Sequence, residues 1–182
     1  MEQTITAHLR EEHQEVRQLL AKVDAASGKE KAELFHQLVA ELVRHEVAEE
    51  EILRPVSKRT AGEEIANARI EEESKAEELL KELEKLDPSS AEFSAKFATL
   101  RQDVEAHAHA EETIEFPKIE AGADPTTLKR LASAFEAAKA AAPTHPHPAT
   151  PNTPAANVLA GPFAAVADRA RDVVRKAMEA AG

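Results

Sequence analysis

The chain has 182 residues, about the size of one ordinary domain. Its 23 Lys and Arg residues against 34 Asp and Glu residues give a formal net charge of −11. An acidic chain without a Lys/Arg-rich run repels phosphate backbones, so nucleic acid is not expected as a partner. The sequence has no cysteine, which excludes disulfide frameworks, thiolate nucleophiles and Cys-ligated metal centres. Any metal chemistry must therefore use His and carboxylate ligands.

Composition and hydropathy favour an all-α protein. The sequence contains no apolar stretch long enough for a signal peptide or a membrane span, which predicts a cytoplasmic protein with no integral membrane segment. Five Gly, no Trp, no Tyr and a remainder rich in Ala, Glu, Lys and Leu are typical of helices rather than sheets. No Gly-rich phosphate loop or nucleophile elbow is present, which argues against kinase and hydrolase chemistry.

Turn and breaker residues divide residues 1–142 into helices. Breaks near 27–28, 60–62, 87–90 and 117–125 separate four long helical patterns and a shorter fifth one. Short connections favour antiparallel neighbours. The expected fold is an up-down-up-down four-helix bundle of two repeated helical hairpins, with a short fifth helix.

The sequence changes character after residue 142. Prolines are concentrated between residues 143 and 162, which predicts a Pro-rich linker over residues 143–157. Apolar residues then recur at steps of four and three, which predicts a C-terminal amphipathic helix over residues 158–182. We expect this helix to dock on the bundle or on another copy as a homodimer; binding of a partner or weak association with a membrane surface is the alternative.

Two segments of the body occur twice. Residues 10–20 align with residues 70–80, so that Glu12 corresponds to Glu72. Residues 45–55 align with residues 107–117 and share His, Ala, Glu, Glu, Ile and Pro at equivalent positions. Two hairpins of one ancestry would pair with an approximate two-fold axis.

Polar side chains interrupt the apolar stripe of every long helix. In the second and fourth helices the interruptions are His and Glu at positions i and i+4, which places both on one face. The stripe of the fourth helix is expected to resume at Ile114. Counting residues from the loops, at about 1.5 Å of rise each, puts all the interruptions at nearly one level. They are His13, His45, Glu49, Glu73, His107 and Glu111.

These six side chains together predict a metal site. A single histidine on such a stripe is more often a core residue with satisfied hydrogen bonds. Six buried ionisable groups would each cost on the order of several kcal/mol, and the stripes show no Lys or Arg to pair with the carboxylates. A bound multivalent cation would offset that cost, whereas without one the bundle would fray or the carboxylates would protonate.

The residues resemble the hemerythrin-like family, whose HHE cation-binding domain is a four-helix bundle around a non-haem di-iron centre. The resemblance covers about residues 5–120 and is carried by Glu12-His13 and the two segments 45–55 and 107–117. It implies two iron ions joined by an oxo or hydroxo bridge, with manganese as the other candidate metal. The ligands that it implies are His13 and His45 on one iron, His107 on the other, and Glu49 and Glu111 bridging both.

The chain departs from the family in its third helix. Glu73 stands where family members commonly carry a histidine, and Glu77 stands at the place of a further family histidine. Anionic oxygen ligands favour ferric over ferrous iron. The chain is therefore expected to bind O2, NO or hydrogen peroxide, with catalase-like or peroxidase-like decomposition of peroxide favoured over reversible O2 carriage.

Two alternatives remain open. The first is an iron or redox sensor whose stability depends on metal occupancy, and the second is a metal-free helical interaction module whose site decayed at Glu73. A ferritin-like di-iron bundle is not favoured, because it requires repeated Glu-x-x-His spacing, which occurs only at Glu33 and His36. The histidines not expected to bind the metal are His8, His36, His109, His145 and His147.

Overall fold

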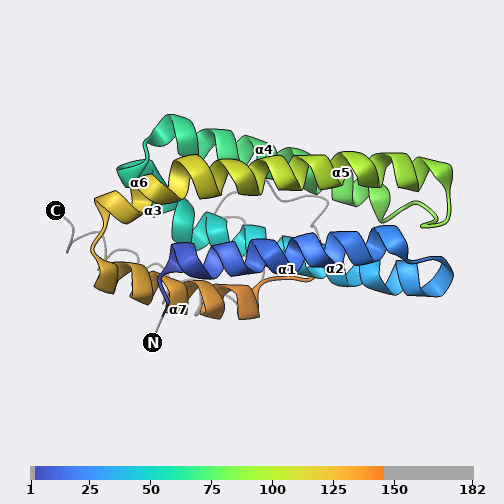
Figure 1. Ribbon diagram of the computed structural model, residues 1–182, viewed down its shortest axis with the longest axis horizontal. Coiled ribbons are helices and arrows are strands. Elements are labelled where there is room, and N and C mark those ends of the chain that lie inside the picture. The colour runs from blue at the N-terminus through green and yellow to red at the C-terminus, as the bar shows by residue number, and fades with distance from the viewer. Residues whose placement is uncertain (1–2, 146–182) are drawn as a thin grey trace.

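The computed structural model describes residues 3–145, and every regular element in this part of the chain is a helix (Figure 1). Helices α1 (Ile5–Ala25) and α2 (Gly28–Ala48) form one antiparallel hairpin. Helices α4 (Glu63–Leu83) and α5 (Ala91–Ala110) form a second hairpin that lies along the first (Figure 1). The expected all-α helical bundle is confirmed.

The second helix of each hairpin changes its winding at the same place. Helix α2 runs into a π-helical segment, η1 (Glu49–Leu53), and then into α3 (Arg54–Thr60). Helix α5 likewise runs into η2 (Glu111–Glu115) and then into α6 (Phe116–Gly122). The two interruptions occupy equivalent positions in the repeated segments of the sequence.

The π-helical segments change which residues face the core. In each segment the backbone N–H of the residue that follows bonds to a carbonyl five residues earlier, from Arg54 to Glu49 and from Phe116 to Glu111. The expectation that Ile114 continues the apolar stripe is wrong, because its side chain is 50% exposed. Phe116 is buried in its place.

Local sequence explains where the helices begin. The side chains of Thr4, Ser90 and Asp124 accept hydrogen bonds from backbone N–H groups in the first turns of α1, α5 and α7 (Pro125–Ala141). Gly62, just before α4, has a φ of 104°, a conformation that favours glycine. Gly62, Ser90 and Asp124 lie within predicted breaks, but the break expected to begin at residue 117 begins only after Gly122, where α6 ends.

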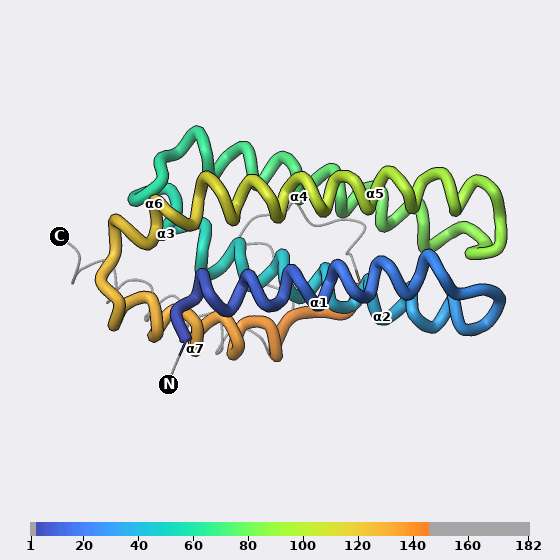
Figure 2. Tube along the Cα trace, viewed as in Figure 1, coloured from blue at the N-terminus to red at the C-terminus, as the bar shows by residue number. Residues whose placement is uncertain are grey.

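The shorter fifth helix, α7 (Pro125–Ala141), packs alongside α1 and α2 at the end of the bundle that carries α3 and α6 (Figure 2). The predicted linker beyond residue 145 and the predicted helix over residues 158–182 lie outside the described residues and stay predictions. Within residues 3–145, no helix is both long and apolar enough to cross a membrane.

Two apolar clusters fill the bundle, and a polar layer separates them. One cluster lies toward α7 and the other toward the α1–α2 and α4–α5 turns. Along α1, Leu9 belongs to the first cluster and Val16 to the second, and His13 lies between them. The aromatic side chains are Phe116 and Phe135 in the first cluster and Phe35, Phe93 and Phe97 in the second.

Candidate metal centre

The polar layer brings six side chains from four helical regions into two groups. The first group is His13, His45, Glu49 and Glu111, and the second is Glu49, Glu73, His107 and Glu111. Within each group, one possible ligand atom from every residue lies within 4.8 Å of those of the others. The two groups share Glu49 and Glu111, which is the arrangement expected of two metal positions with bridging carboxylates.

The helices explain why these side chains converge. Each π-helical segment begins at a shared carboxylate, Glu49 or Glu111, and the histidine four residues earlier lies on the preceding α-helical turn. Single-turn π segments within α-helices are common at functional sites. Glu77 is not in either group, and its carboxylate lies 2.9 Å from the ammonium of Lys81 on the same helix.

Each candidate histidine has its Nδ1 atom held by a carboxylate from another helix. The distances are 2.8 Å from His13 to Glu112, 2.7 Å from His45 to Glu12, and 3.0 Å from His107 to Glu72. A carboxylate that accepts the Nδ1 proton fixes the ring and leaves Nε2 as the ligand atom, a common support for metal-binding histidines.

These supporting carboxylates were not predicted, although the sequence contains a signal for two of them. Glu12 and Glu72 correspond to each other in the internal repeat, and so do the histidines that they hold, His45 and His107. The repeat therefore contains the same Glu–His pair twice, once as Glu12 with His45 and once as Glu72 with His107. Because the two members of each pair lie on different helices, the periodicity of a single helix does not reveal them.

Helix α7 supports the centre from outside. The ammonium of Lys139 lies 2.5 Å from Glu12 Oε1, while Oε2 of the same carboxylate faces His45. The ring of Phe135 lies edge-on to His45, with the ring centres 5.9 Å apart. Helix α7 thus stabilises the position of His45 through both a charge and an aromatic contact.

The other histidines of the described residues are not members of the two groups, although His8 forms a further His and carboxylate group with Glu12 and Glu136. His36 and His109 are exposed, and His145 lies 2.9 Å from Glu84. His8 is partly buried and lies 2.6 Å from Glu136 on α7 and 3.3 Å from Glu12. His147 is outside the described residues.

The first group fits a metal ion. The buried atoms His13 Nε2, Glu49 Oε1 and Glu111 Oε2 have no hydrogen-bond partner. His13 Nε2 lies 3.3 Å from Glu111 Oε2, and His45 Nε2 lies 3.5 Å from Glu49 Oε1. Buried polar atoms are usually satisfied, so imidazole nitrogens and carboxylate oxygens converging without partners indicate a cation site. Imidazole and carboxylate donors suit transition metals such as iron, manganese and zinc.

The second group contains a cation that the sequence analysis missed. The expectation that no Lys or Arg pairs with these carboxylates is wrong, because Arg54 is only 2% exposed and its guanidinium lies among them. Its Nη2 atom lies 2.8 Å from Glu49 Oε2 and 2.5 Å from Glu111 Oε1. It also donates to Glu73 Oε1, while Nη1 donates to Glu115 at 2.7 Å.

The carboxylates raise the pKa of two histidines, His45 and His107. Burial alone would lower the pKa of His45, but the Glu49 carboxylate and the hydrogen bond to Glu12 raise it to about 9. Burial likewise opposes the charged form of His107, whereas Glu111 and Glu49 raise its pKa well above the usual value. In the metal-free protein both imidazoles therefore carry protons that a metal ion would displace.

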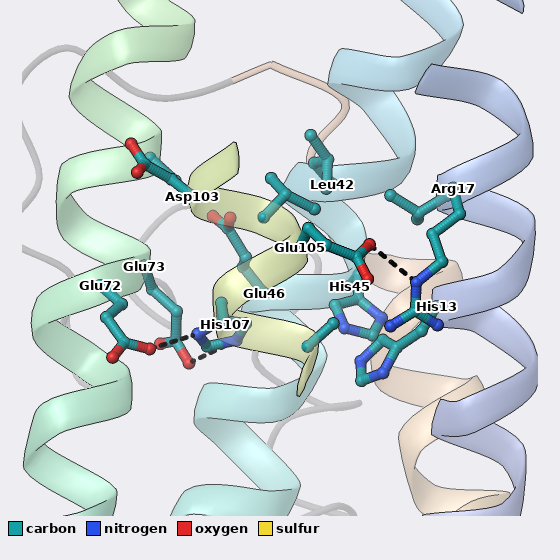
Figure 3. A pocket seen from close by; sticks show the side chains of 14 residues that line it. His13, Arg17, Leu42, His45, Glu46, Glu72, Glu73, Asp103, Glu105 and His107 are labelled. Carbon is teal, nitrogen blue, oxygen red and sulfur yellow. Dashed lines mark hydrogen bonds and ion pairs between the residues drawn. The ribbon is translucent and has the colours of Figure 1, made fainter. Parts of the chain in front are cut away.

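A small cavity lies against the centre (Figure 3). Its volume is about 30 Å³, and Figure 3 shows Glu73 and His107 on one side and His13 and His45 on the other. A single water needs roughly 10–15 Å³ on this measure, so the cavity suits a ligand of about two heavy atoms. The apolar part of its lining consists of Val16, Leu42, Ala76, Val104 and Ala108.

This chain is a helical bundle with two groups of His and carboxylate side chains in its interior. These features place it in the class of helical metal-binding proteins. The hemerythrin HHE cation-binding domain model matches residues 4–119. The chain therefore belongs to the hemerythrin-like family, and the resemblance seen in the sequence is confirmed. Family membership and the clustered ligands together make it a metal-binding protein.

Two curated relatives are similar to the chain. An uncharacterized hemerythrin-like protein of Schizosaccharomyces pombe is 32% identical over 144 residues, which cover 78% of this chain and 71% of the relative. A protein of a Nostoc species named DNA nickase is 29% identical over 132 residues, which cover 72% of this chain and 38% of that protein. No solved structure matches the chain.

We expect the metal-free protein to lose stability as the pH rises from 6 to 8. Burial raises the pKa of Glu46 and of Glu115, to about 8 and about 7, from a usual 4.5. The folded chain then binds more protons than the unfolded chain over this range, so the free energy of unfolding falls by on the order of 4 kcal/mol. The raised pKa of His45 acts in the same direction above its usual value of 6.5.

Urea unfolding of chelator-treated protein at pH 6, 7 and 8 measures this effect. The stabilisation by added metal should change in the opposite sense and increase toward pH 8, because the metal binds the neutral imidazole. Metal-free protein that becomes more stable between pH 6 and pH 8 would contradict the prediction.

Proposed function

We propose that this chain is a non-haem iron protein whose centre binds or turns over a small oxidant, namely O2, NO or hydrogen peroxide. We further propose that it favours peroxide decomposition over reversible O2 carriage. The observation that carries the proposal is the pair of ligand groups sharing Glu49 and Glu111 beside a cavity of about 30 Å³. Each of the three oxidants has two heavy atoms, which suits a cavity of this size.

The chain's own residues supply the ligands and control their orientation. His13, His45, Glu49 and Glu111 would hold one iron, and a second would be held by the group that contains Glu73 and His107. Iron bound there supplies redox chemistry and a coordination position for the oxidant. The supporting carboxylates hold each imidazole with Nε2 directed inward, and the apolar lining limits the entry of water.

Glu46 gives the cavity a proton donor. Its partly buried side chain lines the cavity, and burial together with the Glu73 carboxylate raises its pKa to about 8. In the metal-free protein the carboxyl group therefore holds a proton at pH 7, and it lines the cavity in which an oxidant would bind. Decomposition of two peroxide molecules to two waters and one O2 needs proton transfer but no external reductant, which makes peroxide the favoured substrate.

Metal analysis and oxygen evolution test the proposal. Protein expressed with iron and purified aerobically should retain iron and evolve O2 when hydrogen peroxide is added. The near-ultraviolet spectrum should show iron charge-transfer bands, since a chain without Trp or Tyr contributes little there. The matched variant Glu46→Gln should keep its iron and lose on the order of 100-fold in turnover, as is typical for removal of a general acid.

Two outcomes would point to other functions. Iron that stabilises the fold without any peroxide turnover would favour an iron or redox sensor. Protein that retains no metal and unfolds identically with and without chelator would favour the helical interaction module.

A further inference from the structure

The two ligand groups differ in what their buried atoms already contact. Glu49 and Glu111 each direct one oxygen toward His45 or His13, and these oxygens have no hydrogen-bond partner. The second oxygen of each carboxylate accepts a hydrogen bond from Nη2 of Arg54. Each shared carboxylate therefore has one oxygen without a hydrogen-bond partner, on the side of the first group. Its other oxygen is hydrogen-bonded to Arg54, on the side of the second group.

The guanidinium lies where a metal ion of the second group would lie. Nη2 of Arg54 contacts one oxygen each of Glu49, Glu73 and Glu111. These are the same oxygens that lie 3.5 to 3.9 Å from Nε2 of His107. Carboxylates bind a metal ion such as zinc at about 2.0–2.2 Å, so an ion held by these three oxygens would overlap Nη2. The two cations exclude each other.

We propose that Arg54 is a resident cation at the His107 half of the centre. The chain then binds one metal ion tightly, through His13, His45, Glu49 and Glu111, and takes a second ion only when the guanidinium leaves. This inference rests on the proposed function for the identity of the metal, and it changes the number of ions that the resting protein holds.

Charge and covalent placement support this role. Arginine stays protonated under all ordinary conditions, so its positive charge is permanent. Its side chain is anchored one residue after η1, which itself begins at the shared ligand Glu49. A second ion must therefore displace a cation that is tethered to the site and bonded to four carboxylates, one of which is Glu115.

Iron(II) titration of the full chain tests the proposal. Chelator-treated protein is titrated anaerobically, and the iron retained after gel filtration is counted per chain. The wild type should retain one ion, with a second bound about 100-fold more weakly or worse, because that ion must break buried ion pairs. Arg54→Gln, which removes the permanent charge, should retain two. After oxidation, a lone ferric ion gives a half-integer-spin resonance signal, whereas a coupled ferric pair does not.

Histidine variants keep the test decisive if Arg54→Gln does not fold. In the wild-type background, His45→Ala should abolish the tight binding step, whereas His107→Ala should retain one ion per chain. Two equally tight ions in the wild type, one ion in a folded Arg54→Gln variant, or loss of the tight ion in His107→Ala would each overturn the inference alone. A wild type that retains no iron would overturn the proposed function together with it.

Discussion

Replacing Arg54 with glutamine is expected to destabilise the metal-free protein by about 3–5 kcal/mol, the usual effect of removing one partner from a buried ion pair. Four carboxylates accept hydrogen bonds from this guanidinium, and three of them, Glu49, Glu111 and Glu115, are fully buried. Without Arg54 they must protonate or open the bundle. Urea unfolding of chelator-treated wild type and variant measures the difference.

A surface arginine provides the matched control. Arg101 pairs with Asp24, and both side chains are exposed. Arg101→Gln is therefore expected to change the free energy of unfolding by less than about 1 kcal/mol. Added iron should return most of the stability lost in Arg54→Gln, because a metal ion then takes over the charge of the guanidinium. Equal unfolding curves for the two metal-free variants would show that the buried charges do not depend on Arg54.

The periodicity of the sequence predicts the long helices and the helix faces that meet in the core. Apolar steps of three and four residues locate the long helices, and the histidine and glutamate that interrupt them converge in the structure because both lie on the core face. His45 and Glu49 show this for the first hairpin, and His107 and Glu111 for the second. Such inferences need only the α-helical period, which holds up to the start of each π-helical segment.

Arg54 could not be predicted from that period. On an α-helix of about 3.6 residues per turn, a residue five positions after Glu49 lies about 140° away and would face outward. In the π-helical segment the backbone N–H of Arg54 bonds to the carbonyl of Glu49, which brings the two residues to one face. The same change of winding exposes Ile114 and buries Glu115. The sequence carries no recognised signal for a π-helical segment. Arg54 could therefore not be predicted as the partner of the buried carboxylates.

The number of metal ions is likewise a property of tertiary structure. The ligand types and their spacing give both groups the appearance of metal sites, since each contains imidazole and carboxylate donors. Only the three-dimensional arrangement shows that Glu49 and Glu111 each have one unpartnered oxygen on the side of the first group, while their other oxygens accept hydrogen bonds from the guanidinium on the side of the second. Residues that are equivalent in the internal repeat thus end in different electrostatic surroundings.

The second large effect is expected at Glu111, the shared carboxylate of η2. Glu111→Gln should weaken iron binding by more than about 100-fold, because it removes a charged ligand atom from both groups. The adjacent Glu112→Gln should weaken it by only about 10–100-fold, because Glu112 acts through the Nδ1 atom of His13. The two substitutions are chemically identical and lie one residue apart, so the ratio of their effects separates a ligand from a supporting residue.

Competition between each variant and a chelator of known affinity measures these effects, and unfolding of the metal-free forms serves as the control for folding. Glu111→Gln removes one negative charge from a carboxylate cluster that Arg54 alone does not neutralise, so the metal-free variant is expected to remain folded. Equal losses of affinity in the two variants would place Glu111 outside the metal's direct contacts. Undiminished iron binding in Glu111→Gln would show that Glu111 is not a ligand. It would also contradict the inference that the two groups share this carboxylate.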